Sequence, residues 1–248
     1  MSSIAAAWKK LPWWVEPMTV ASVLTIFGVY SLTVVILEPG RYEEYLSPFY
    51  SPPIPRPEWL PWFVTAPMFV LWIPLGLRAT CYYYRKAYYR AFFWDPPACG
   101  AGEQRREPRA PENYRGERAL FVLNNVHRYF LYGSFVVIAF LWYDTVLTFF
   151  PEGSFGIKVG SVLWLVNVVL LSMYSLSCHS MRHVVGGDKD CYTCLRGGNA
   201  RRNAYNGITR LNLQHPLWAW LSMFSVLGTD IYLRLIMAGV IPDLTLIG

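Results

Sequence analysis

The sequence predicts an all-α integral membrane bundle of five transmembrane helices, forming a single domain over residues 1–248. Three observations carry this prediction. Of the 248 residues, 54% are hydrophobic and only 15% are charged, against roughly 25% charged in an average soluble domain. The mean hydropathy is positive, at +0.26. Aromatic residues make up 17%, including eleven Trp, as in proteins whose aromatic belts lie at the two membrane interfaces.

Five apolar segments are long enough to cross a bilayer, because a hydrocarbon core of about 30 Å needs roughly 20 helical residues. The third segment exceeds that length, which predicts a tilt or an extension past the headgroups. The expected helices are residues 18–37, 59–93, 119–150, 157–183 and 216–240. Four connections join these segments. Residues 38–58 are proline-rich, and residues 94–118 are polar. Residues 151–156 form a short turn, and residues 184–214 are Gly-rich and basic.

The distribution of charge predicts the orientation. The net charge is +6, and most of the 22 lysines and arginines lie in the N-terminal arm, between Arg78 and Arg128, or between Arg182 and Arg210. The positive-inside rule places these regions in the cytoplasm, so we expect a cytoplasmic N-terminus in a multi-pass protein of the inner (plasma) membrane. The basic residues follow helix ends and no nucleic-acid-binding motif is present, so nucleic acid is not an expected partner.

The five cysteines and four histidines all fall on the cytoplasmic side of this topology. His179 and His183 are spaced i, i+4 and share a helix face. Two Cys with two His form the ligand set of a Rieske-type 2Fe-2S cluster, and two His from different helices can hold a haem b axially. The alternatives are histidines that contact water or lipid and cysteines that pack as small hydrophobes. The candidate metal ligands are Cys81, Cys178, His127, His179 and His183.

Ionisable residues inside the expected helices are candidates for function. Asp230 and Arg234 are spaced i, i+4, which predicts a local ion pair. Asp144 has no partner on its own helix and could instead pair with Arg234 across helices. A proton path or an outer quinone pocket is the functional alternative for these three residues.

A second set of polar residues lies at the cytoplasmic interface. Arg182 could neutralise a haem propionate or hydrogen-bond a quinone carbonyl, and His215 could cap the fifth helix or face a quinone head group. Trp218 lies one turn further along the same helix. The sequence has no P-loop, GxSxG, HExxH or dinucleotide fingerprint. We therefore expect a subunit that is non-catalytic alone rather than a self-contained enzyme.

Two classes of protein without a redox centre are alternative interpretations of the sequence. A cofactor-free transporter or channel subunit would use Asp144, Asp230 and Arg234 as its pathway, but no internal repeat or paired broken helices are visible. A metal-free assembly or scaffold protein would leave the grouping of Cys and His to coincidence.

Several runs of residues resemble one family. They are RATCYYYRKAYYR from Arg78, PPAC from Pro96, NNVHRYF from Asn124 and SCHSMRHVVGG from Ser177. Together they resemble the membrane-anchor subunit of actinobacterial-type succinate dehydrogenase (complex II). The last run is also similar to the His-rich helix end of cytochrome b subunits of other succinate dehydrogenases.

The resemblance implies an anchor that relays electrons to menaquinone through a Rieske-type 2Fe-2S cluster in place of haem. Its partners would be the flavoprotein and iron–sulfur subunits on the cytoplasmic face, within a trimer of the whole complex. Cys81 and Cys178 would supply thiolates, with Cys99 in reserve, and His127, His179 and His183 would compete for two imidazole positions. Because no Cys-x-His pair occurs here, the haem b alternative stays open. The quinone candidates are Arg182, His215 and Trp218 on the inner side and Asp144, Asp230 and Arg234 on the outer side.

Overall fold

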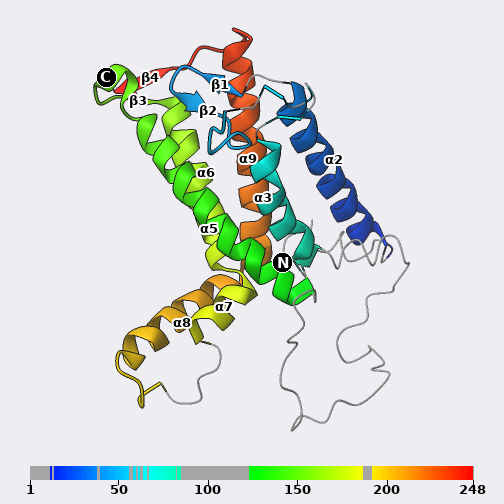
Figure 1. Cartoon of the computed structure of the whole chain (residues 1–248), viewed down its shortest axis with the longest axis vertical. Coiled ribbons are helices and arrows are strands. Elements are labelled where there is room, and N and C mark those ends of the chain that lie inside the picture. Colours follow the sequence, from blue (N-terminus) through cyan, green and yellow to red (C-terminus); the bar gives the residue numbers. More distant parts are fainter. Residues whose placement is uncertain are drawn as a thin grey trace.

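The computed structural model describes residues 12, 14–37, 40–55, 58–59, 61, 64–65, 67–81, 83–84, 123–186 and 192–247. This part of the chain contains seven α-helices. Four of them have the length and hydropathy to cross a membrane. These four helices are α2 (Val15–Leu37), α5 (Leu123–Leu147), α6 (Val159–Leu176) and α9 (His215–Met237). With the shorter α3 (Met68–Thr80) they form one bundle (Figure 1).

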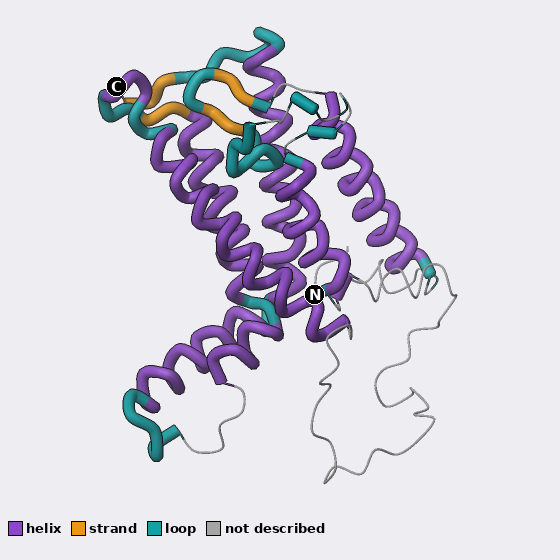
Figure 2. Tube along the Cα trace, in the orientation of Figure 1, coloured by secondary structure: helices purple, strands orange, loops and turns teal. Residues whose placement is uncertain are grey.

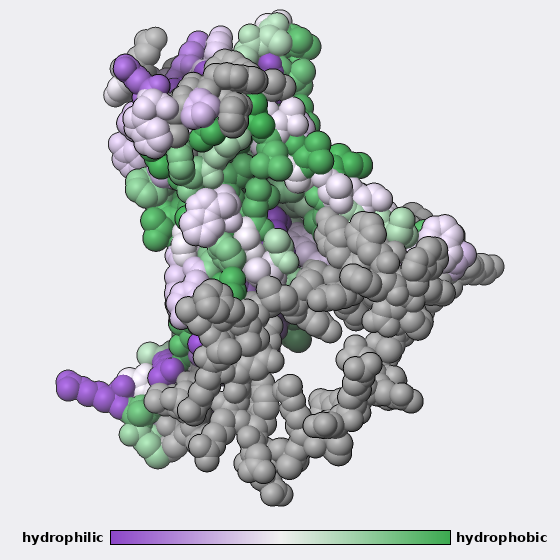
Figure 3. Space-filling view, turned by 45° about the vertical axis from the view of Figure 1, so that its right-hand side comes forward, coloured by the Kyte–Doolittle hydropathy of each residue, from purple (hydrophilic) through white to green (hydrophobic). Residues whose placement is uncertain are grey.

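The bundle presents apolar side chains outward as well as inward. Only 28% to 39% of the residues in each of the four spans are buried within the protein. Large apolar side chains such as Ile26, Trp142 and Phe224 are exposed. Figure 3 shows hydrophobic surface over the bundle and hydrophilic surface at both ends. This arrangement suits helices whose outer faces meet lipid rather than water.

The second helix differs from its prediction. It was expected over 59–93, but α3 runs from Met68 to Thr80. Trp59 lies in a turn, and Pro67 stands at the N-cap. Prolines fix φ and lack a backbone N–H, so apolar character alone did not extend this helix. Its 13 residues span about 20 Å, less than the hydrocarbon core of about 30 Å.

The end of α3 is set by Cys81, whose extended backbone (φ −62°, ψ 127°) stops the helix, although residues 83 and 84 are helical again. Residues 85–93 of the predicted segment and Cys99 lie outside the described residues. The helix packs closely on α5, because a Cβ at Gly76 would overlap the Phe130 ring. Small residues at such contacts let membrane helices approach each other.

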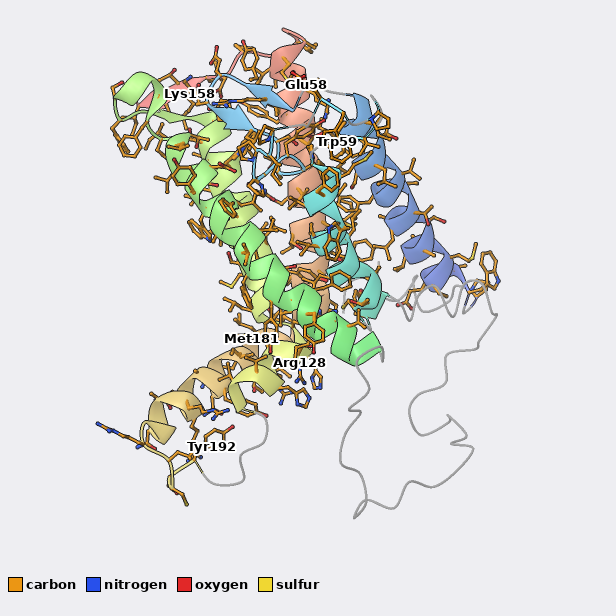
Figure 4. All side chains as sticks on the ribbon, viewed as in Figure 1. Glu58, Trp59, Arg128, Lys158, Met181 and Tyr192 are labelled. Carbon is orange, nitrogen blue, oxygen red and sulfur yellow. The ribbon has the colours of Figure 1, made fainter. Side chains whose placement is uncertain are left out.

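The fourth predicted helix, 157–183, is interrupted. Residues 157 and 158 form a short strand, α6 ends at Leu176, and a separate helix α7 (His179–Gly186) begins after Ser177 and Cys178. The Gly-rich basic connection expected over 184–214 contains a further helix, α8 (Gly198–Asn212). Because α8 is polar with a narrow apolar face, it gave no membrane-span signal. Both helices lie at one end of the bundle, where Figure 4 also shows Arg128 and Met181.

The opposite end is closed by two small two-stranded sheets, which Figure 2 shows above the helices; the first of them is a hairpin. β1 (Arg41–Tyr42) pairs with β2 (Tyr45–Leu46), and β3 (Ile157–Lys158) pairs with β4 (Thr245–Ile247), both antiparallel. A 3₁₀ turn covers Pro151–Gly153. This end is called the hairpin end below, and the end with α7 and α8 is called the α7 end.

The remaining predicted helices keep their type but shift in extent. The first begins at Val15 rather than residue 18, and the fifth covers His215–Met237 rather than 216–240. The third is helical over Leu123–Leu147 and ends in a turn before Phe150. Residues 119–122 of that segment lie outside the described residues. A fifth membrane span and the direction of the N-terminus stay predictions.

Candidate functional site

Two cysteines and two histidines from four segments meet at the α7 end of the bundle. Cys81 follows α3, Cys178 lies between α6 and α7, His127 is on α5, and His215 opens α9. All four are buried, and both cysteines are free thiols. The two cysteines belong to one buried apolar cluster with Tyr174. The irregular backbone at Cys81 and Cys178 turns both side chains into the bundle end instead of continuing a helix face.

His127 is held at both ring nitrogens. Its Nε2 lies 2.9 Å from the Cys178 Sγ, and its Nδ1 lies 2.9 Å from the Thr80 Oγ1. Thr80 donates its hydroxyl proton to the Gly76 carbonyl at 2.7 Å. Since a hydroxyl carries one proton, Thr80 can only accept from His127. His127 is therefore protonated at Nδ1, and its Nε2 lone pair faces sulfur.

His215 repeats the arrangement with different partners. Its Nε2 lies 3.6 Å from the Cys81 Sγ, and its Nδ1 lies 2.7 Å from the Ser177 Oγ. Ser177 donates its own proton to the Tyr174 carbonyl at 2.9 Å. Ser177 must therefore accept from the His215 Nδ1–H. Both imidazoles thus have the tautomer in which Nε2 can bind a metal and a hydroxyl oxygen accepts the hydrogen bond of Nδ1–H.

The thiols are protonated in this arrangement. Burial raises the pKa of Cys178 to about 11. Burial also raises the pKa of Cys81, although backbone groups of Tyr83 and Tyr84 and the positive charge of Arg78 act in the opposite direction. Each thiol can donate its proton to the facing imidazole. Metal binding at these sulfurs would require loss of both protons.

His179 and His183, predicted as competing ligands, lie apart on α7. Their Nε2 atoms are 3.1 Å from each other, and their rings meet edge to face. Burial lowers the pKa of both, helped by neighbouring positive charge from Arg182 and, for His183, from Arg128. The Nε2 atoms of His179 and His183 therefore contact each other, whereas those of His127 and His215 face thiols.

The donor set fits a Rieske-type cluster in chemistry. Two buried thiols and two imidazoles whose Nε2 atoms face those thiols are the required types of ligand. Within the described part of the chain, no three His, Cys, Asp or Glu side chains converge to hold one metal ion. The four donors instead contact one another as two sulfur–nitrogen pairs, so binding would need these side chains to separate. Cys194 is disulfide-bonded and offers no free thiol.

Sequence reasoning missed three groups at this site. His215 was expected to face a quinone or cap α9, and neither Thr80 nor Ser177 was considered. A signal was present, because each hydroxyl residue directly precedes one of the two cysteines, as Thr80-Cys81 and Ser177-Cys178. The contact between His215 and Cys81 joins residues 134 positions apart, which no local pattern indicates.

Arg78 is a further member of this end that the sequence reasoning did not assign. Its guanidinium donates to the Tyr84 hydroxyl at 2.8 Å, the Ala219 carbonyl at 3.2 Å and the Ser222 Oγ at 3.0 Å. It also lies over the Tyr174 ring, 4.6 Å from the ring centroid. All these partners are uncharged.

The inner quinone candidates are separated by the fold. Arg182 donates to the Tyr205 hydroxyl at 2.9 Å and lies over the same ring, which ties α7 to α8. Trp218 packs against the cluster that contains both cysteines. Its buried indole Nε1–H has no hydrogen-bond partner among the described residues.

The outer candidates lie toward the hairpin end. Asp230 pairs with Arg234 at 2.8 Å, which confirms the predicted i, i+4 ion pair. Asp230 also accepts from Tyr30 at 2.6 Å and Ser47 at 2.5 Å. The alternative Asp144–Arg234 ion pair is not among those in the described residues. The Asp144 Oδ2 is buried there without a hydrogen-bond partner.

The fold and the site define a multi-pass helical membrane subunit with thiols and imidazoles grouped at one bundle end. The family described as "Actinobacterial succinate dehydrogenase subunit SdhC" matches residues 15–239. The chain belongs to this family and is a subunit of succinate dehydrogenase in the inner membrane. It is similar to a chain of the "Mycobacterium smegmatis Sdh1 complex in the apo form", with 33% identity, a TM-score of 0.78, and coverage of 96% of this chain and 93% of that one. No curated protein matches the chain.

Proposed function

We propose that this subunit is the quinone-reducing membrane anchor of its complex and holds a Rieske-type 2Fe-2S cluster through Cys81, Cys178, His127 and His215. The tautomers of the two histidines carry this proposal. At each histidine, the hydroxyl of Thr80 or Ser177 donates its proton to a backbone carbonyl and so can only accept from Nδ1–H. The Nε2 lone pair of each imidazole therefore faces a thiol. Two unrelated hydroxyl residues acting in the same way on two histidines suit a pair of metal ligands.

The protein's own groups prepare the site. Thr80 and Ser177 orient the imidazoles, and the surrounding apolar cluster excludes water from the thiols. A Rieske-type 2Fe-2S cluster, when bound, would supply one-electron transfer. Its histidine ligands raise its reduction potential above that of an all-cysteine cluster. That potential suits the last relay between a soluble iron–sulfur partner and a quinone.

The acceptor in this proposal is menaquinone near the α7 end. Trp218 supports the location, because its buried indole N–H lacks an acceptor beside the cysteine cluster. A quinone carbonyl could accept that hydrogen bond. Arg182, which holds Tyr205, would border the site from α7.

The same proposal includes the topology and the partners. The described arginines of α7, α8 and their connection lie at one end, namely Arg182, Arg196, Arg201, Arg202 and Arg210. The positive-inside rule makes this end cytoplasmic, with the N-terminus on the same side if α3 serves as a fifth, short span. The flavoprotein and iron–sulfur subunits would then dock on it, in a trimer of whole complexes.

The histidines provide the test. The intact complex is purified with wild-type anchor and with His127→Ala, His215→Ala, His179→Ala or His183→Ala, reduced with dithionite, and examined by low-temperature EPR and optical spectroscopy. We expect a rhombic signal with average g near roughly 1.9 that is lost in the first two variants and kept in the last two. Subunit content on a native gel checks assembly.

Three outcomes would contradict the proposal. Loss of the signal in His179→Ala or His183→Ala but not in His215→Ala would move the imidazole ligands to α7. A strong Soret band that is insensitive to Cys81→Ser would replace the cluster with haem b. A wild-type complex with neither signal would leave an anchor that binds quinone alone.

A further inference from the structure

Arg78 is a buried cation without a carboxylate partner in the described part of the chain. Its side chain belongs to a residue that is only 9% exposed. Among the described residues the ion pairs join Lys158 to Glu43 and Glu44, and Arg234 to Asp230. Arg78 instead donates to two hydroxyls and one backbone carbonyl. Hydrogen bonds of this kind satisfy its N–H groups but do not neutralise its charge.

Aromatic rings surround the guanidinium without providing negative charge. Its central carbon lies 4.6 Å from the centroid of the Tyr174 ring and 5.8 Å from those of Phe27 and Tyr84. Arg78 also lines a pocket whose other walls are mostly apolar. The free energy of cation–π contacts offsets only part of the free energy needed to remove such a charge from water. A buried site that keeps an unpaired cation therefore suits negative charge supplied from elsewhere.

The nearest redox candidate is one aromatic ring away. The Tyr174 ring has the guanidinium against it and also stacks on the His215 imidazole, with centroids 5.2 Å apart and planes 19° apart. The His215 Nε2 faces the Cys81 Sγ at 3.6 Å. Arg78 itself lies three residues before Cys81, at the last turn of α3. The cation thus stands beside the four donors rather than among them.

We propose that Arg78 is a built-in counter-charge that stabilises the reduced state of the centre, and this rests on the proposed function. Two ferric ions, two sulfides, two thiolates and two neutral imidazoles sum to zero charge. One electron, delivered by the soluble iron–sulfur partner, makes the sum minus one without forming or breaking a bond. In a low-dielectric interior this new charge attracts the Arg78 guanidinium. Arg78 is a positioning residue in this role, because the described hydrogen bonds of its guanidinium go to Tyr84, Ala219 and Ser222 and not to the four donors.

The midpoint potential of the centre tests the proposal. An EPR-monitored redox titration is carried out on the intact complex with wild-type anchor and with Arg78→Gln, Arg78→Lys or Arg41→Gln. At the wild-type midpoint, we expect Arg78→Gln to lower the ratio of reduced to oxidised centre about tenfold, which is about 59 mV toward negative potential. Arg78→Lys keeps the charge and should stay near wild type. Arg41→Gln removes an exposed cation at the hairpin end and should leave the midpoint potential unchanged.

A second variant covers the case in which Arg78→Gln fails to assemble. Ser222→Asp places a carboxylate at the present acceptor of Arg78 Nη2 and neutralises the cation while keeping it. We expect the same negative shift. A normal wild-type signal with an unchanged midpoint in Arg78→Gln and Ser222→Asp would overturn this inference alone. Absence of the signal from the wild-type complex would instead overturn the proposed function.

Discussion

The polar groups at the two ends of the bundle differ in the partners that the chain provides for them. At the hairpin end, Asp243 accepts from Tyr45 at 2.6 Å, Tyr232 at 2.8 Å and the Gly160 backbone N–H at 3.1 Å. Asp230 likewise accepts from two hydroxyls and Arg234. At the α7 end, the Arg78 charge has no carboxylate partner among the described residues, and two imidazole lone pairs face thiols.

This difference separates architecture from function. A carboxylate that accepts three hydrogen bonds is satisfied within the chain, so its role is to join elements. Asp243 joins the β1–β2 hairpin to α6 and α9. Asp230, on α9, joins Ser47, which directly follows β2, to Tyr30 on α2. The α7 end differs, because among the described residues the Arg78 charge has no carboxylate partner and the two imidazole Nε2 atoms contact thiols. The ionisable residues described here therefore divide into carboxylates whose hydrogen-bond donors lie within the chain and a cation whose described neighbours are uncharged.

The largest expected effect on stability comes from Asp230. In Asp230→Ala, Tyr30 and Ser47 lose their acceptor and Arg234 loses its counter-ion. Breaking a buried pair in this way costs about 3–5 kcal/mol. We expect a lower thermal midpoint in detergent with an unchanged EPR signal in whatever complex assembles. Thermal unfolding followed by circular dichroism measures it.

Asp144→Asn is the matched control for Asp230. Its Oδ2 has no hydrogen-bond partner among the described residues, so replacement by an amide should cost less than Asp230→Ala. An equal or larger loss in Asp144→Asn would mean that the hydrogen bonds of Asp230 do not make it the structural carboxylate of this end.

The next largest effect concerns the hydroxyls that hold the histidines. Thr80→Val and Ser177→Ala remove the acceptors of the two Nδ1–H groups while keeping all four donors. Loss of a second-shell partner typically costs about 10–100-fold in metal affinity. We expect iron to dissociate from the anchor at correspondingly lower chelator concentration. Iron content and EPR amplitude after graded chelator treatment measure this loss.

Thr19→Val serves as the control, because its hydroxyl donates to the Val15 carbonyl at an exposed position of α2. If Thr80→Val and Ser177→Ala retained iron as well as Thr19→Val does, the hydroxyls would not orient metal ligands. The tautomer argument would then lose its functional meaning.

The sequence predicted the type of every long helix because apolar runs of 20 residues have few other stable forms in a chain of this composition. It misplaced the bounds where backbone chemistry overrides hydropathy. Pro67 sets the start of α3, and the break at Ser177 and Cys178 divides the fourth helix. Hydropathy does not register a two-residue break within an apolar segment.

The candidate site was predicted in part for a similar reason. The sequence indicated that Cys81, Cys178 and His127 would gather at one end, because topology alone brings helix ends together. It left His127, His179 and His183 in competition and assigned His215 to a quinone or a helix cap, since the contact of His215 with Cys81 depends on how α9 packs against α3 and α6. The i, i+4 spacing of His179 and His183 predicted a shared face correctly, and the shared face turned out to satisfy the two rings with each other.

The smallest effect concerns pH at the hairpin end. Lys158 donates to Glu44 at 2.6 Å, and the two side chains are 20% and 14% exposed. The hydrogen bond to Glu44 raises the pKa of Lys158. Burial and the hydrogen bond to Asp243 raise the pKa of Tyr45 in the same region. A raised pKa means that the folded state holds the proton more tightly, so this stability is lost as pH rises.

The contribution of Lys158 is fully present below its unfolded pKa of about 10.4 and disappears as pH rises through the higher folded value. Lys158→Gln should therefore lower stability by about 0.5–1 kcal/mol at pH 8. The difference from wild type should shrink above pH of about 10.5. Thermal midpoints of both proteins between roughly pH 8 and 11 measure it. A difference that stays constant over this range would show that Lys158 acts through packing of its stem rather than through its charge, and the hairpin end would then be held by neutral hydrogen bonds alone.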